Sequence, residues 1–221
     1  VLTAVIRWQK KSDSLWLSFL QNFAGVLFIF SGWVKAIDPL GTAYKMEQYF
    51  AEFQATFAET WLSFIAPLFP ALASLSAGFS VFMIILEIVL GLMLITGTKP
   101  KLSAWLFFLI VLFFTFLTGF TFLTGYVADG VNFFSFSDWG EYDANNMKVT
   151  DCGCFGDFLK LEPRISFYKD LVLLVPALLF LFFSRTMHQL WTPPIRLSLV
   201  GIATVGLLIY CLSNYVWDLP H

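Results

Sequence analysis

The sequence predicts an all-α integral membrane protein, and three observations support this class. Hydrophobic residues make up 58% of the 221 residues and charged residues only 13%, whereas a soluble domain carries roughly 25% charged residues. The mean hydropathy is +0.77, and the 27 Phe, 8 Trp and 7 Tyr suit lipid-facing helices with aromatic belts. This composition excludes a soluble enzyme, a disordered chain and a cysteine-rich scaffold. The net charge of −2 gives no basic surface, so we expect no nucleic-acid partner.

Long apolar runs predict the positions of the transmembrane helices, because crossing a hydrocarbon core of about 30 Å takes about 20 helical residues. The runs that reach this length are 16–36, 75–96, 102–127, 170–187 and 197–215. They are continuous rather than alternating, which indicates helices and not the strands of a membrane barrel. The fourth run has the shortest apolar centre and contains Pro176, which can kink a helix.

The distribution of Lys and Arg predicts a cytoplasmic N-terminus and an outside C-terminus. With this orientation the inside segments 1–15, 97–101 and 184–196 are short and basic. They contain Arg7, Lys10, Lys11, Lys99, Lys101, Arg185 and Arg196. The first run lacks a small-residue cleavage site, so we expect it to remain as an anchor. We also expect the natural chain to start slightly earlier and to continue downstream.

The first outside loop, 37–74, predicts an amphipathic helix on the outer face or over the end of the bundle. Its apolar side chains recur every three or four residues, at Met46, Phe50, Phe53, Phe57, Trp61 and Phe64. Pro67 and Pro70 are expected to end it. Packing is the simpler interpretation of this helix, and a docking surface is the alternative.

The second outside loop, 128–169, contains two of the three cysteines, as Cys152-Gly153-Cys154. On an oxidising membrane face such a pair forms a disulfide. The small ring is strained and therefore exchanges readily with thiolates. A structural bridge is the alternative, and a metal site is disfavoured because the loop lacks His. Arg164 follows the pair closely and can stabilise a thiolate if the loop folds back.

The third cysteine, Cys211, lies near the outer end of the fifth run. It is a candidate third thiol for the loop pair, although a lone apolar Cys is more often a small core residue.

Glu87 lies near the middle of the second run, where an acid is costly unless it is neutral, paired or hydrated. A carboxyl group at this depth suits proton uptake and release during redox turnover. A structural hydrogen bond between helices is an equally good interpretation. Lys35 and Asp38, at the outer end of the first run, are the nearest polar candidates, although Lys35 can instead extend toward the membrane surface.

Three segments resemble a known family. Residues 31–39 (SGWVKAIDP) resemble the SG…K…DP signature of DoxX-like membrane proteins, and residues 86–91 (LEIVLG) resemble their E…G second helix. Residues 151–156 (DCGCFG) resemble the corresponding segment of the MauE branch. The resemblance implies a four-helix DoxX/MauE-like transmembrane bundle, here with a fifth transmembrane helix and the outer amphipathic helix. It also implies a Bacteroidetes-like bacterial protein of the inner membrane with a thiol–disulfide or quinone-linked redox role.

The expected function is therefore disulfide exchange between Cys152 and Cys154 and an extracytoplasmic thiol protein, with electrons passing to a membrane quinone. The cysteine loop and the C-terminus would then be periplasmic. A non-catalytic subunit or scaffold of a cell-envelope complex is the alternative. A solute or proton pathway through Glu87 ranks last, since a single buried acid supports it.

Overall fold

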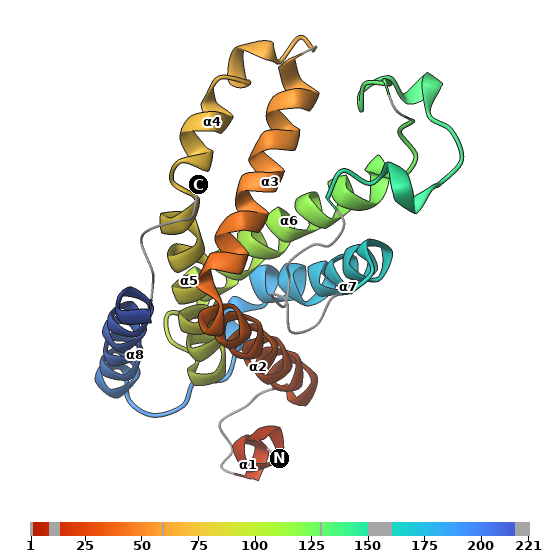
Figure 1. Cartoon of the computed structure of the whole chain (residues 1–221). Helices are drawn as coiled ribbons and strands as arrows, with labels where there is room; N and C mark the ends of the chain where they lie inside the picture. Colours follow the sequence, from red (N-terminus) through yellow and green to blue (C-terminus); the bar gives the residue numbers. More distant parts are fainter. Residues whose placement is uncertain (1, 9–13, 59, 129, 150–160, 215–221) are drawn as a thin grey trace.

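The computed structural model describes residues 2–8, 14–58, 60–128, 130–149 and 161–214, and most of these residues are helical (Figure 1). No strand occurs among them. The α-helices are α1 (Leu2–Trp8), α2 (Leu15–Ile37), α3 (Pro39–Ala58), α4 (Leu68–Ala73), α5 (Ser76–Thr96), α6 (Pro100–Thr124), α7 (Pro163–Phe182) and α8 (Pro193–Asn214). Short 3-10 helices are η1 (Ser63–Ile65), η2 (Phe136–Asp138), η3 (Ala144–Asn146) and η4 (Ser184–Thr186).

Five of these helices, α2, α5, α6, α7 and α8, are long and apolar enough to cross a membrane. The prediction of an all-α integral membrane protein is confirmed. Four of the five share one apolar core, in which α2 contributes Phe28, α5 contributes Leu90, α6 contributes Phe107 and α7 contributes Phe180. Helix α8 lies outside this core against α5, and only 11% of its apolar span is buried.

Glycines bring α2 and α5 into close contact. A Cβ atom on Gly25 would lie 2.8 Å from the carbonyl oxygen of Gly91, and one on Gly91 would lie 2.6 Å from that of Gly25. The two backbones therefore touch without intervening side chains, which is a common way for membrane helices to associate. This contact sets the spacing of the helix pair that carries Lys35 and Glu87.

The amphipathic helix predicted within segment 37–74 forms, but it is shorter than expected. Helix α3 ends at Ala58, and Trp61 and Phe64 lie beyond it with 83% and 73% of their surfaces exposed. The two prolines expected to end a helix instead begin α4, with Pro67 at its N-cap and Pro70 in its first turn. Proline is tolerated there because first-turn N–H groups have no intrahelical partner. The buried face of α3 packs on α6.

The start of α7 also differs from expectation, and the N-terminal segment contains an additional helix. Helix α7 begins at Pro163, seven residues before the expected start at 170, so Lys169 and Asp170 are helical. Proline is favoured at the first helical position, which explains this start. The first two turns contain Arg164, Lys169 and Asp170, so the apolar run used to predict the helix began later. The N-terminal segment contains α1. Its Thr3 hydroxyl accepts a hydrogen bond from Asn22 of α2 at 3.1 Å, and this contact links α1 to the bundle.

Candidate functional site

The most unusual feature of the bundle is a buried ion pair between α2 and α5. The Lys35 Nζ atom lies 2.6 Å from Glu87 Oε1, and the two side chains are 3% and 1% exposed. Lys35 also donates to the Ser31 hydroxyl at 3.0 Å and lies over the Phe114 ring at 4.9 Å from its centroid. Lys35 therefore points into the bundle and not toward the membrane surface.

A second acid, Asp170, faces the same region from α7 and is 1% exposed. Its Oδ2 accepts a hydrogen bond from the Thr118 hydroxyl at 3.0 Å, and its Oδ1 lies 2.5 Å from Lys169 Nζ. Each of the four core helices thus contributes polar side chains to one region. We call this set the polar centre, and its members are Ser31, Lys35, Glu87, Thr118, Lys169 and Asp170.

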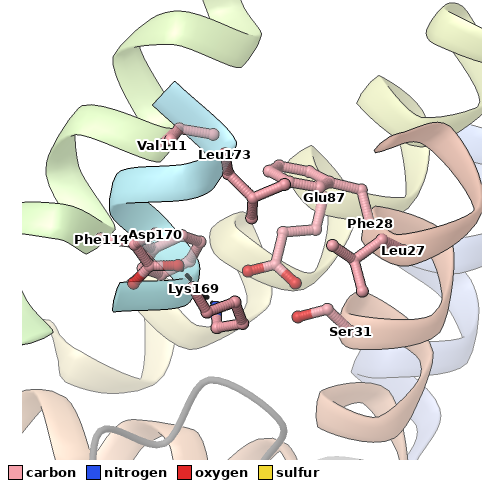
Figure 2. A pocket seen from close by; sticks show the side chains of 9 residues that line it. All are labelled: Leu27, Phe28, Ser31, Glu87, Val111, Phe114, Lys169, Asp170 and Leu173. Atoms are coloured by element: carbon pink, nitrogen blue, oxygen red, sulfur yellow. Dashed lines mark hydrogen bonds and ion pairs between the residues drawn. The ribbon is translucent and has the colours of Figure 1, made fainter. Parts of the chain in front are cut away.

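A small cavity joins the two ion pairs of the polar centre. It has a volume of about 20 Å³ and is lined by Glu87, Ser31, Lys169, Asp170 and neighbouring apolar side chains. Figure 2 shows the Glu87 carboxylate pointing into the space between Ser31 on α2 and the Lys169–Asp170 pair on α7. Glu87 Oε2 is buried and has no hydrogen-bond partner among the described residues. A space of this size can hold one water molecule.

Glu87 lies near the middle of a helix that is long and apolar enough to cross a membrane. Glu87 is the twelfth residue of the 21-residue helix α5, which puts it about 16 Å from the start of the helix at 1.5 Å per residue. Ionisable residues at this depth are costly, and they typically line ion, proton or substrate pathways. An ion pair with a spare carboxylate oxygen facing a water-sized cavity can accept, hold and release a proton.

The structure does not bring Asp38 into the polar centre. Asp38 is exposed at the end of α2, and its Oδ1 accepts a hydrogen bond from the backbone N–H of Gly41 at 3.0 Å. It therefore caps the start of α3. Arg164 lies in the first turn of α7 with its guanidinium group 5.8 Å from the centroid of the Tyr168 ring.

The thiol of Cys211 is fully buried in an apolar cluster formed by α2, α5 and α8. Its neighbours include Ala36 and Ile88, so it fills the position of a small core residue. Cys152 and Cys154 lie outside the described residues, as does the whole segment 150–160.

The residues on either side of the cysteine segment are well anchored. Val149 is 1% exposed and packs with Tyr49 of α3 and Leu117 of α6. On the other side, Pro163 begins the helix that carries Lys169 and Asp170. Both flanks of the segment thus belong to the part of the bundle that contains Thr118 and Asp170.

Two apolar pockets accompany the polar centre. One, of about 290 Å³, lies among α3, α6, α7 and the loop that follows α6. It is lined by seven aromatic rings together with Thr56, Thr115, Gly119 and Leu123. A Cβ atom on Gly119 would lie 2.9 Å from the Phe167 ring, so this glycine allows α7 to approach α6. The other pocket, of about 460 Å³, lies among α3, α4, α5 and α6 and is entirely apolar.

A second cluster of buried polar side chains lies at the C-terminal end of α5. Gln21 Nε2 donates to the carbonyl oxygens of Leu94 and His188 at 2.6 and 3.2 Å, and its Oε1 accepts from the His188 backbone N–H. His188 Nε2 lies 2.9 Å from the Ile95 carbonyl oxygen and Arg196 Nη1 donates to the Gly97 carbonyl at 2.6 Å. These contacts satisfy the last carbonyls of α5. Burial lowers the pKa of His188 below 6.5, against the smaller opposing effect of the Ile95 bond.

Sequence reasoning identified Glu87 and Lys35 but not Asp170, Lys169 or Thr118 as members of one site. A pattern in α6 could have indicated the third helix, because Thr115, Thr118, Thr121 and Thr124 recur every three residues in a run rich in Phe. A spacing of three moves each side chain by about 60° around the helix, so Thr118, Thr121 and Thr124 share one side, and this polar side predicts the face that turns away from lipid. Asp170 carries a weaker signal, since it lies at the edge of an apolar run.

Comparison with known protein families, curated proteins and solved structures finds no match for this chain. The DoxX/MauE-like resemblance therefore stays a prediction.

Proposed function

We propose that this protein is an integral membrane thiol–disulfide redox protein of the bacterial inner membrane. In this proposal the N-terminus is cytoplasmic and the loop with Cys152 and Cys154 faces the periplasm. The disulfide between these two cysteines accepts electrons from an extracytoplasmic dithiol protein, which becomes oxidised to a disulfide. Cys152 and Cys154 are left as thiols and must be reoxidised before the next cycle.

Reoxidation requires an acceptor for two electrons and two protons, and a membrane quinone has this chemistry. Oxidation of the two thiols forms the Cys152–Cys154 disulfide, and the quinone takes up both electrons and both protons to become a quinol. The pocket of about 290 Å³ lined by Phe side chains supports this assignment, because aromatic rings pack well against a planar, apolar ligand.

The observation that carries the proposal is the polar centre, with its unpartnered Glu87 oxygen at a water-sized cavity. A purely structural bundle gains little from ionisable groups at this depth, because well-packed apolar residues are often as stable or more stable. Proton-coupled electron transfer, in contrast, needs a group that exchanges protons inside the membrane. Glu87 has the geometry for this role, because its Oε1 lies 2.6 Å from Lys35 Nζ and its Oε2 faces the cavity.

Thiol trapping in intact cells tests the cysteine chemistry. A membrane-impermeant maleimide should label Cys152 and Cys154 after mild reduction, and the C152S/C154S variant should leave extracytoplasmic client proteins reduced. C211S is the matched control and should preserve client oxidation. Unchanged client oxidation in C152S/C154S, or labelling from the cytoplasmic side, would contradict the proposal. Copurification of a stoichiometric partner with that active variant would support a scaffold instead.

The proton role of Glu87 has its own test. In purified protein, E87Q should slow reoxidation of the reduced cysteine pair by a short-chain quinone. Reoxidation by a soluble small-molecule disulfide should stay unchanged, because that reaction does not use the membrane interior. Equal slowing of both reactions would indicate a structural role for Glu87.

A further inference from the structure

A basic pocket lies at the end of the bundle where α5 ends and α6 begins, and it shares no lining residue with the cavity of the polar centre. It is formed by the start of α6 and the segment around η4, and its volume is about 510 Å³. The residues that line it are Lys99, Pro100, Lys101, Leu102, Ser184, Arg185 and Gln189. The proposed redox function uses none of these residues.

The pocket concentrates positive charge that the described residues do not neutralise. Lys99, Lys101 and Arg185 are exposed, and no ion pair connects any of them to a described acid. The two segments that form the pocket, 97–105 and 184–196, contain no Asp or Glu. Three cations around one pocket therefore favour an anionic ligand.

The first turn of α6 adds backbone donors to this charge. The helix starts at Pro100, and its N-cap residue Lys99 makes no side-chain capping hydrogen bond. The backbone N–H groups of Lys101 and Leu102 are in the first turn, where no intrahelical carbonyl is available to them. Phosphate groups bind well to such a helix end, because N–H groups and the helix dipole both face them.

An apolar surface continues from the pocket along α6. Leu102, Trp105 and Leu109 share one helix face, at spacings of three and four, and are 46%, 57% and 53% exposed. In a membrane this face contacts acyl chains. A ligand that combines a phosphate with acyl chains can occupy the basic pocket and this face together, whereas free phosphate uses only the pocket.

We propose that the pocket formed by Lys99, Lys101 and Arg185 binds the phosphate headgroup of an anionic phospholipid, with the acyl chains along the exposed face of α6. Basic pockets between transmembrane helices commonly bind such headgroups. The chemistry shared with other ligands is a phosphate anion, and the acyl chains distinguish the lipid from inorganic phosphate.

Binding of fluorescent phosphatidylglycerol to the purified protein in zwitterionic detergent tests the proposal. We expect the K99Q/K101Q/R185Q variant to bind about a hundredfold more weakly, because each cation contributes roughly a fivefold effect. Wild-type binding should weaken as salt is raised. Phosphatidylcholine should bind wild type and variant equally weakly.

Two further variants separate lost binding from lost folding. K99R/K101R keeps the charge and should retain the affinity, while K45Q/K148Q/R164Q removes three cations elsewhere and should bind like wild type. Circular dichroism and thermal unfolding without lipid establish that each variant is folded. Equal lipid affinity of folded wild type and K99Q/K101Q/R185Q would overturn the proposal. Saturable binding of inorganic phosphate without retention of the lipid would also overturn it.

Discussion

The Lys35–Glu87 pair makes a quantitative prediction about stability. At a separation of 2.6 Å, two unit charges attract each other by roughly 6 kcal/mol at an effective dielectric constant of about 20. Desolvation of both groups offsets most of this attraction, by several kcal/mol per ion. The pair therefore adds little to the free energy of unfolding compared with two apolar side chains. Each charge nevertheless needs the other, because an unpaired buried charge is strongly destabilising.

Replacing one partner should consequently be much more damaging than replacing both. K35M leaves Glu87 as an uncompensated buried acid, and we expect a loss of about 3–5 kcal/mol in the free energy of unfolding. For a chain of this length that corresponds to a fall of roughly 10 °C in Tm. K35M/E87M should recover most or all of the loss, because methionine fills similar space without charge.

Unfolding by SDS in mixed micelles, with thermal unfolding in detergent as a second measurement, gives the required double-mutant cycle. D38N is the matched control: Asp38 is an exposed acid at the end of the same helix, and asparagine remains a good helix cap, so its effect should stay below about 0.5 kcal/mol. Additive losses from K35M and E87M, without recovery in the double variant, would refute the coupling that the geometry implies.

Three other predictions concern contacts elsewhere in the bundle. T118V removes the hydroxyl donor to Asp170 and should destabilise the protein by about 1.5–3 kcal/mol in the same SDS titration, whereas T115V, whose hydroxyl bonds only its own helix, should lose less than about 1 kcal/mol. G91A should lower Tm because its Cβ would lie 2.6 Å from the Gly25 carbonyl oxygen; G78A, with nothing within 4 Å, should be neutral or stabilising by up to about 1 kcal/mol. The pKa of His188 is lowered in the folded state, so its contribution to stability is complete above pH 6.5 and is lost as the pH falls below that value, by at most about 1.4 kcal/mol per pH unit. H188Q should flatten this part of the curve of unfolding free energy against pH, and an unchanged slope would contradict the assignment.

The sequence predicted the transmembrane helices well wherever an apolar run was the whole signal. The expected run 75–96 and the observed helix Ser76–Thr96 differ by one residue at the start. Where polar residues begin a helix, as in α7, the apolar run placed the start seven residues late. The amphipathic spacing continued past Ala58 to Phe64, because periodicity alone does not reveal where the chain turns.

Only part of the candidate site was predicted from the sequence, for a similar reason. An acid within an apolar run, such as Glu87, is easily identified in the sequence because ionisable residues are rare inside transmembrane segments. Asp170 lies at a run boundary, where polar residues are common, and only the packing of α7 on α6 reveals that it is buried. Asp38 was grouped with Lys35 through nearness in sequence. The chain leaves the helical conformation at Asp38, the C-cap of α2, so its carboxylate accepts a hydrogen bond from Gly41 of α3 and does not join Lys35 and Glu87.

The glycines of α2 and the polar centre depend on the same helix contact. A Cβ atom on Gly32 would lie 3.1 Å from the Cβ atom of Glu87 and 2.6 Å from Ile88 Cγ1. Gly32 is therefore where α2 approaches α5 at the level of the buried acid, and Lys35 follows less than one turn later. A larger residue at position 32 would separate the helices and lengthen the Lys35–Glu87 distance, even though it removes no charged group. The polar centre thus requires close packing of α2 on α5 as much as it requires its ionisable side chains.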